Sequence, residues 1–293
     1  MMDEEKIIKA GKIASKIREK WKKKIKRGMK LVEIAEGIEK DILSMGGKPA
    51  FPVNIGIDEV AAHYTPAFDD DSLARGLIKV DFGVSLEGWL SDTAFSLDLD
   101  NCPKNKKLIE TAEKALEAAI NLANPNSKLG EIGKTIQKTI NQAGFVPISN
   151  LTGHSIERYE LHAGKVIPNL DNKSPEEMGE GVFAIEPFVT DGRGKVYDGP
   201  FSEIYKLVST KAVRGTLSRK ILKFIKENYN TLPFCSRWII NKFGTKAKFY
   251  LHQLELNGNL HRYHQLIESS HSKVAQAEHT FLLTSEKKIV TTR

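Results

Sequence analysis

Two aspartates, Asp81 and Asp92, lie in a segment whose alternating apolar residues predict a β-hairpin, LIKVDFGVSLEGWLSDTAFSLDL. We place its connection at residues 85–88, because SLEG consists of turn-forming residues. The two carboxylates are then direct cross-strand neighbours, with Cβ atoms about 5 Å apart. Their repulsion is about 3 kcal/mol at an effective dielectric constant of roughly 20. A shared proton, a basic partner or a cation must offset it. Because VDF is too apolar for a solvated surface hairpin, we favour a divalent metal.

The composition is typical of an intracellular globular protein. The 293 residues are 40% hydrophobic, enough for one large domain or a domain with an insert. No segment approaches the ~20 apolar residues of a membrane span, and the charged start MMDEEKIIKAGK does not resemble a secretory signal. The two cysteines, Cys102 and Cys235, predict neither a disulfide framework nor a thiolate zinc site. We therefore expect a reducing, cytoplasmic setting without membrane contact.

Much of the net charge of +7 lies in residues 12–30. In KIREKWKKKIKRGMK the apolar residues recur at helical spacing, and the lysines occupy the other face. The simpler interpretation is the solvated outer face of a packed helix. The alternative is a weak electrostatic contact with RNA, for example on a ribosome.

The chain contains an internal repeat. KLVEIAEGIEKDILSMGG, which starts at Lys30, resembles KLGEIGKTIQKTINQAGF, which starts at Lys128. Both copies predict an amphipathic helix that ends at glycine. The first copy leads to AAHYTP with His63, and the second leads to LTGHSIERYELHAG with His154 and His162. Two such halves predict a site on a pseudo-two-fold axis, and chance similarity of two amphipathic helices is the alternative.

Two later strand-like segments, 181–189 and 274–284, each carry one glutamate among apolar residues, Glu186 and Glu278. A buried glutamate requires a partner. Between these segments we expect an inserted, mainly helical subdomain at 200–265, so that residues 1–199 and 266–293 form the main domain. The histidines near its end lack metal-ligand spacing and are expected at the surface: His252, His261, His264 and His271.

These observations assemble one set of candidate metal ligands: Asp81, Asp92, His154, Glu186 and Glu278. Four carboxylates and one imidazole suit Mn²⁺, Fe²⁺, Co²⁺ or Zn²⁺. Because four carboxylates exceed what one ion needs, we expect two divalent ions ~3.5–4 Å apart, which would activate water for hydrolysis. The spacing alone decides neither whether the five residues converge nor whether the substrate is a carbonyl or a phosphoryl compound.

In this order, the motifs VDFG, SDTAFS, TGHSI with YELHAG, FAIEPF and AEHT resemble those of methionine aminopeptidases over essentially the whole chain. The helical insert and short N-terminus resemble the type II branch in its archaeal-sized form. The resemblance implies an α+β pita-bread (creatinase/aminopeptidase) fold with two pseudo-symmetric halves around a dinuclear centre. It also implies removal of the initiator methionine from nascent peptides, with a preference for a small second residue. We expect a monomer.

The resemblance further implies roles for the five ligands. Asp92 and Glu278 would bridge two ions of cobalt, manganese, iron(II) or zinc. Asp81 would chelate one ion, and His154 and Glu186 would complete the other. Glu186 would also carry a proton from the attacking water to the leaving amine.

The remaining site residues are likewise implied by the resemblance. His63 matches the histidine at the scissile amide nitrogen, and His162 the one near the carbonyl. Since a straight strand would place His162 about 26 Å from His154, the chain must bend within SIERYE. For the methionine pocket, Phe51 matches the aromatic wall, Tyr263 lies where the type II family has a tyrosine, and Ile204 is expected beside Tyr263 at a position that is histidine in some relatives. Each of the three also fits ordinary core packing.

Two other functions are less favoured. Xaa-Pro peptidases of this fold share the five ligands but usually carry a sizeable N-terminal domain, whereas this chain begins almost at the first repeat helix. A non-enzymatic RNA- or ribosome-binding relative would have lost metal ligands, and all five are present here.

Overall fold

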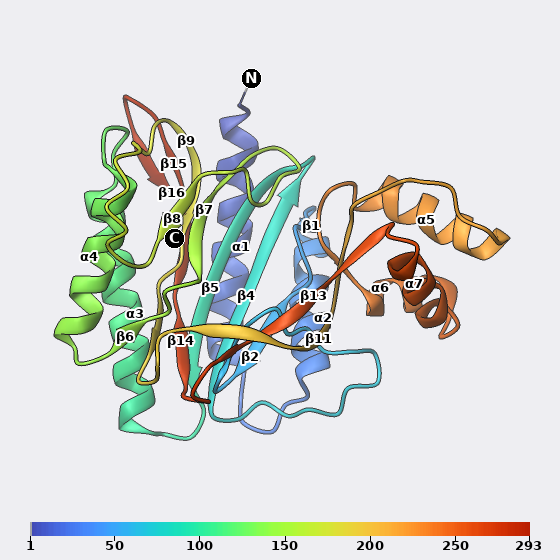
Figure 1. Cartoon of the computed structure of the whole chain (residues 1–293), viewed down its shortest axis with the longest axis horizontal. Coiled ribbons are helices and arrows are strands. Elements are labelled where there is room, and N and C mark those ends of the chain that lie inside the picture. The colour runs from blue at the N-terminus through green and yellow to red at the C-terminus, as the bar shows by residue number, and fades with distance from the viewer. Residues whose placement is uncertain (1) are drawn as a thin grey trace.

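The computed structural model describes residues 2–293 as an α+β fold around one large antiparallel sheet (Figure 1). Its strands follow the order β1–β4–β5–β15–β9–β7–β8, with β2 paired to β4 and β16 paired to β15. The two longest strands of the sheet form a hairpin, β4 (Leu77–Leu86) and β5 (Trp89–Asp98). The other strands are β1 (Lys48–Pro49), β2 (Asn54–Ile57), β7 (Thr152–Ile156), β8 (Val166–Pro168), β9 (Gly181–Ile185), β15 (Glu278–Leu283) and β16 (Lys288–Val290).

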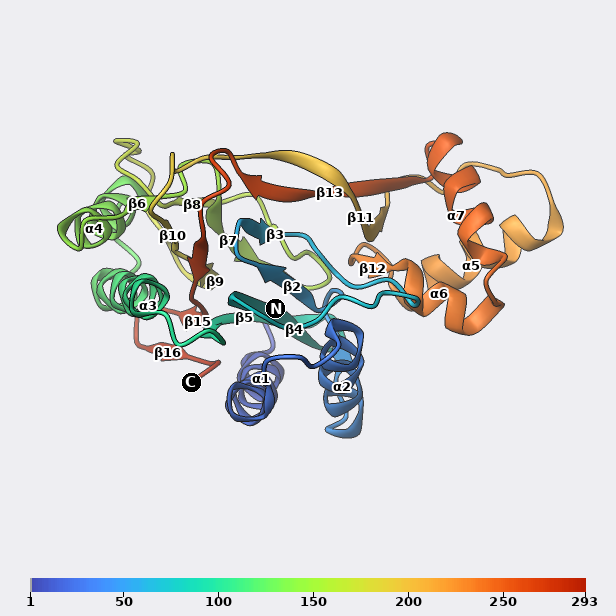
Figure 2. The same cartoon turned by 90° about the horizontal axis from the view of Figure 1, so that it is seen from below.

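Four helices cover one face of this sheet, as Figure 2 shows. α1 (Glu4–Lys24) and α2 (Leu31–Ser44) pack on the hairpin, while α3 (Pro103–Leu122) and α4 (Leu129–Gln142) pack on the other half. Val80, Phe82 and Val84 of β4 are buried against α1 and α2. Because successive side chains of a strand point to opposite faces, Asp81 projects from the face without these helices.

The register of the β4–β5 hairpin differs from the one expected from sequence. The turn is the two-residue connection Glu87–Gly88, with φ of 53° and 90°, and a type I′ turn requires positive φ at both positions. Asp81 therefore pairs with Ala94, and Asp92 pairs with Gly83. The prediction of directly paired aspartates across a loop at 85–88 is wrong, and the two are diagonal neighbours instead. Since the partner shifts by two residues, both still lie on the same face.

The internal repeat corresponds to two similar helices. α2 and α4 both have 14 residues, and each follows a lysine in extended conformation, Lys30 or Lys128. Each is followed by a glycine with φ near +80°, Gly46 (82°) or Gly144 (83°). Each then leads into a two-residue strand that ends in proline, β1 or β6 (Val146–Pro147). The two halves of the chain therefore repeat one local design.

A second layer lies across the open face of the sheet (Figure 2). β11 (Val196–Leu207) and β13 (Leu260–Glu268) form a long ribbon with β12 (Phe234–Cys235) and β3 (Val60–Ala62). β10 (Phe188–Thr190) pairs with β14 (Val274–Gln276) and β6 in a small separate sheet. Between β11 and β13 come α5 (Thr216–Asn228), α6 (Ser236–Phe243) and α7 (Ala247–Leu256). The helical part of the expected insert is thus 216–256, and the division into domains stays a prediction.

The three insert helices have their own apolar core but meet α2 through a buried ion pair. Arg237, only 1% exposed, donates to both oxygens of Glu39 at 2.6 and 3.0 Å. The indole of Trp238 donates to the same carboxylate at 2.9 Å. Within residues 2–293, no helix combines the length and apolar character needed to cross a membrane.

Candidate metal centre

The five predicted ligands come from five adjacent strands. In the order of the sheet they are Asp81 on β4, Asp92 on β5, Glu278 on β15, Glu186 directly after β9 and His154 on β7. Glu278 and Asp81 both pair with Ala94 of β5, so these three residues lie side by side across β4, β5 and β15. The covered face of these strands carries apolar residues such as Phe183 and Phe281. The sheet therefore gathers all five ligands on its open face.

Both glutamate-bearing segments are interrupted beside the glutamate, although the sequence predicts continuous strands at 181–189 and 274–284. β9 ends at Ile185, and β10 begins at Phe188. β14 ends at Gln276, and β15 begins at Glu278. β10 and β14 leave the large sheet and pair with each other. The two breaks thus place both glutamates where the large sheet passes into the small one.

The side-chain atoms of these residues converge. Asp92, His154 and Glu278 each offer one ligand atom, and the three atoms lie within 4.8 Å of one another. His154 Nε2 is 3.6 Å from Asp92 Oδ2 and 3.8 Å from Glu186 Oε1. Asp81 and Glu186 are joined by Gln276, whose amide donates to one oxygen of each at 3.3 Å. The structure therefore brings all five together.

Such crowding of acids strongly disfavours their ionised form. Burial, followed by the charge of Asp92, raises the pKa of Asp81 well above its usual value. Burial and neighbouring acids likewise raise the pKa values of Glu186 and Glu278, and burial raises the pKa of Asp92 to about 7. Burial lowers the pKa of His154 to about 4, which keeps the imidazole neutral and able to bind a metal.

The donor set fits divalent cations. Both oxygens of Glu278, and Oδ1 of Asp81 and of Asp92, are buried without a hydrogen-bond partner. Among residues 2–293, no lysine or arginine nitrogen lies within 4.0 Å of these four acids. Buried polar groups are almost always satisfied in folded proteins. Oxygen-rich sites with one imidazole bind first-row divalent metals, and such ions would satisfy these orphaned oxygens.

A cavity of about 380 Å³ opens on the acids and contains both predicted catalytic histidines. The chain reverses after β7 through the Glu157–Glu160 bridge, which confirms the expected bend. His162 thereby stacks edge-on against His154, with ring centroids 4.3 Å apart. His63, at φ 63°, faces the cavity from beyond β3. Burial, and then the neighbouring histidine, lowers the pKa of His63 to about 4 and of His162 to about 3.

The three predicted pocket residues line the same cavity: Phe51, Ile204 and Tyr263. The Phe51 ring lies against Gly83 of the VDFG motif, where an added Cβ would be 2.7 Å from the ring and 2.5 Å from the oxygen of Ser91. Glycine is therefore required at position 83, because Phe51 and the backbone of Ser91 leave no room for a Cβ atom. Tyr263 meets His63 edge-on at 5.2 Å. A role of these residues in binding methionine stays a prediction.

Several residues of the site escaped the analysis of the sequence. Gln276 lies two positions before Glu278 in VAQAE, and this same-face spacing was the available signal. Asn54, which pairs with Asp81, and Pro233, from the segment before α6, line the cavity. Their placement depends on long-range pairing. Of the histidines expected at the surface, three are exposed, while His264 is half-buried and packs on Phe201 at 4.2 Å.

Comparison with known proteins identifies the family. Residues 5–284 match the model of metallopeptidase family M24. The chain belongs to this family. The M24 chain is 43% identical over 292 residues to "Methionine aminopeptidase" of Methanocaldococcus jannaschii, with 99% of this chain and 98% of the relative covered. It is also 43% identical to the protein of that name from Pyrococcus horikoshii, with 99% and 100% covered.

Solved structures show the same fold for the M24 chain. A thermophilic Arx1 superposes with a TM-score of 0.83 at 18% identity, covering 98% of this chain and 89% of that one. Methionine aminopeptidase from Thermotoga maritima gives 0.71 at 21% identity, with 99% and 96% covered. Prolidase from Pyrococcus furiosus gives 0.61 at 18% identity, and only 63% of its chain is covered. The shared architecture is the pita-bread fold.

Proposed function

We propose that this M24 chain removes the N-terminal methionine from peptides and nascent proteins by metal-dependent hydrolysis, with a preference for a small second residue. The main support for this proposal is the cluster of buried carboxylate oxygens without hydrogen-bond partners, which lies beside a cavity lined by His63 and His162. The full-length similarity to the two archaeal methionine aminopeptidases supports this substrate over an Xaa-Pro peptide.

Two divalent ions would balance the four carboxylates, whereas one would leave two negative charges buried. Asp92 and Glu278 occupy the middle strands of the ligand row, which supports their holding both ions. Asp81 lies at one side of the row, with Glu186 and His154 at the other, so each side would hold one ion. When bound, the ions would lower the pKa of water and polarise the substrate carbonyl.

The chain's own residues would perform the remaining steps. Glu186, at the cavity wall, would accept the proton of the attacking water and deliver it to the leaving amine. His162 would donate a hydrogen bond to the carbonyl oxygen as negative charge develops there. His63 would hold the leaving nitrogen. Phe51 would contact the thioether side chain in the apolar part of the cavity.

The decisive experiment measures methionine release from Met-Ala-Ser by the metal-loaded protein. Acetyl-Met-Ala-Ser serves as the control without a free amine, and an Xaa-Pro peptide tests the alternative substrate. We expect release from the free tripeptide only, and its loss in Asp92→Asn. Full activity of Asp92→Asn would exclude the role of this carboxylate, and faster cleavage of the Xaa-Pro peptide would exclude the substrate.

We also propose that the protein acts in the cytoplasm and makes a weak contact with ribosomal RNA through α1. This helix ends in three lysines, Lys22, Lys23 and Lys24. Lys24 lies over the Trp21 ring, and Lys22 reaches Glu113 at 4.0 Å. Lys23 and Lys24 are exposed. Neutralising the three should weaken ribosome co-sedimentation at low salt. Unchanged co-sedimentation would contradict the contact.

A further inference from the structure

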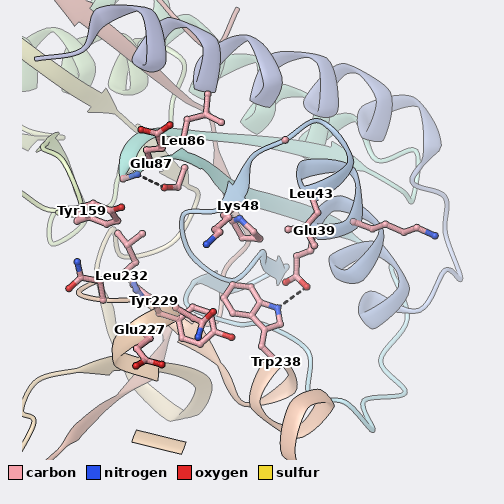
Figure 3. A pocket seen from close by; sticks show the side chains of 18 of the residues that line it. Glu39, Leu43, Lys48, Leu86, Glu87, Tyr159, Glu227, Tyr229, Leu232 and Trp238 are labelled. Atoms are coloured by element: carbon pink, nitrogen blue, oxygen red, sulfur yellow. Dashed lines mark hydrogen bonds between the residues drawn. The ribbon is translucent and has the colours of Figure 1, made fainter. Parts of the chain in front are cut away.

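A groove of about 960 Å³ separates the helical part of the insert from the main sheet. Figure 3 shows the tip of the β4–β5 hairpin, with Leu86 and Glu87, on one side and the insert residues Tyr229 and Trp238 on the other. Pro233 lines both this insert groove and the metal-centre cavity, whereas the neighbouring Leu232 lines only the groove. The two spaces are therefore distinct and share one wall.

The insert groove exposes apolar surface. Leu43 of α2, which lines it, is 59% exposed. Leu86, Tyr159, Tyr229 and Trp238 are only half-buried. Partly exposed aromatic side chains in a concave surface are typical of protein-binding sites.

The walls of the groove also carry more positive than negative charge. The basic lining residues are Lys6, Lys9, Lys40, Lys48, Lys226 and Arg237, and the acidic ones are Glu36, Glu39, Glu87 and Glu227. Arg237 is paired with Glu39, and Lys6 with Glu87. Glu227 is paired with Lys223, outside the groove.

Four lysines consequently remain for a ligand: Lys9, Lys40, Lys48 and Lys226. In the described part of the chain, no carboxylate lies within 4.0 Å of their ammonium groups. They come from α1, α2, β1 and α5, so they surround the groove on several sides. Figure 3 places Lys48 between the hairpin tip and the two insert aromatics.

The groove is held in shape by contacts across its walls. The Thr231 hydroxyl donates to the Tyr159 carbonyl, and the Tyr159 amide donates to the Gly88 carbonyl at 2.8 Å. The Glu39–Arg237 pair closes the other side. A preformed groove loses little conformational entropy when it binds a ligand.

We propose that the insert groove binds an acidic peptide segment of a partner protein that carries a large apolar side chain. Its carboxylates would meet the four lysines, and its apolar side chain would cover Trp238 and Leu43. Nucleic acid fits less well, because Glu36 and Glu227 lie among the lysines. The Tyr229 ring is also already stacked on Phe234 at 5.2 Å and packs on Trp238 at 5.5 Å, which leaves edges rather than open faces for bases.

The test uses the peptide acetyl-Glu-Asp-Phe-Glu-Asp-Leu-Glu-amide, whose blocked end prevents it from being a substrate. Binding to the metal-loaded full chain is measured by isothermal titration calorimetry and by tryptophan fluorescence. We expect saturable binding that weakens as sodium chloride rises from about 50 to about 300 mM. Saturating free methionine should change the affinity for the peptide by no more than about twofold, because methionine occupies the metal-centre cavity and not the insert groove.

Matched charge reversals locate the peptide. Lys48→Glu with Lys226→Glu should weaken binding by about tenfold or more. Lys114→Glu with Lys134→Glu changes the net charge equally on exposed positions of α3 and α4 and should leave binding within about twofold. Methionine release from Met-Ala-Ser verifies that both variants are folded.

Four results would overturn the proposal. They are no binding at about 1 mM peptide, equal loss in both charge-reversed variants, competition by free methionine, and displacement of the peptide by an oligouridine at equal concentration. Self-association that disappears in Lys48→Glu with Lys226→Glu, measured by analytical ultracentrifugation without peptide, would assign the groove to a second copy of the chain instead.

Discussion

Replacing Glu39 with alanine tests how the insert is fixed to the main sheet. The substitution removes the two hydrogen bonds that Arg237 donates to Glu39, at 2.6 and 3.0 Å, and the acceptor of the Trp238 indole. Arg237 is 1% exposed, so water cannot easily replace the lost carboxylate. Breaking a buried ion pair by removing one partner costs about 3–5 kcal/mol. We therefore expect Glu39→Ala to lower the free energy of unfolding by about 4 kcal/mol.

Urea denaturation followed by tryptophan fluorescence measures this loss. Glu36→Ala is the matched control, because Glu36 lies on the same helix but is exposed, and we expect a change within about 0.5 kcal/mol. The double variant Glu39→Leu with Arg237→Met removes both charges and keeps similar volumes, so most of the stability should return. A loss below about 1 kcal/mol in Glu39→Ala, or a double variant less stable than the single one, would refute this reasoning.

Three further substitutions test the site. His162→Ala should lower kcat for Met-Ala-Ser by about 10²–10³-fold while metal content, measured by atomic emission, stays unchanged; lost metal would contradict a role at the carbonyl. Gln276→Leu should weaken Mn²⁺ binding by about 10–100-fold in calorimetry, because Asp81 and Glu186 lose their shared donor. Unchanged affinity would show that the amide orients neither acid. Gly83→Ala should lower the free energy of unfolding by about 1–3 kcal/mol through its clash with the strand and the neighbouring ring; wild-type stability would contradict the close approach.

The face of the sheet on which Asp81 lies was predictable from sequence, because it depends on local alternation. Asp81 stands between apolar residues of β4, and this period of two fixes its face before any pairing is known. The register was not predictable, because it depends on Glu87 adopting positive φ, which a non-glycine residue rarely does. The internal repeat could be recognised in the sequence because two helices of equal length are each followed by a glycine, Gly46 or Gly144.

Other parts of the site depend on distant contacts that no local pattern encodes. His162 reaches His154 only through the reversal at 157–160, and family motifs rather than periodicity indicated its role. Pro233 reaches the cavity because β12 pairs with β11. The insert groove forms between segments far apart in the chain, so its lysines cannot be distinguished by sequence from any other surface lysines.

The central claim is that the buried acids converge because divalent cations neutralise them, and linkage between pH and stability tests it. In metal-free protein the pKa of Asp92 is raised from 3.8 to about 7. A raised carboxyl pKa gives stability that is present below pH 4 and is lost as the pH rises to about 7, because the folded state retains a proton that the unfolded state releases. This loss is about 4 kcal/mol, at about 1.4 kcal/mol per pH unit.

The measurement is the free energy of unfolding of the wild type minus that of Asp92→Asn, from pH 4 to 8, with and without excess Mn²⁺. The asparagine variant keeps the other titrating groups and lacks only the Asp92 carboxyl, so the difference reports the ionisation of Asp92 together with its coupling to the neighbouring acids. Without metal, we predict that the difference falls by several kcal/mol as the pH rises. With Mn²⁺ it should instead grow with pH, because protons no longer compete with the ions for the acids. A difference that is flat with pH and unchanged by Mn²⁺ would contradict the account.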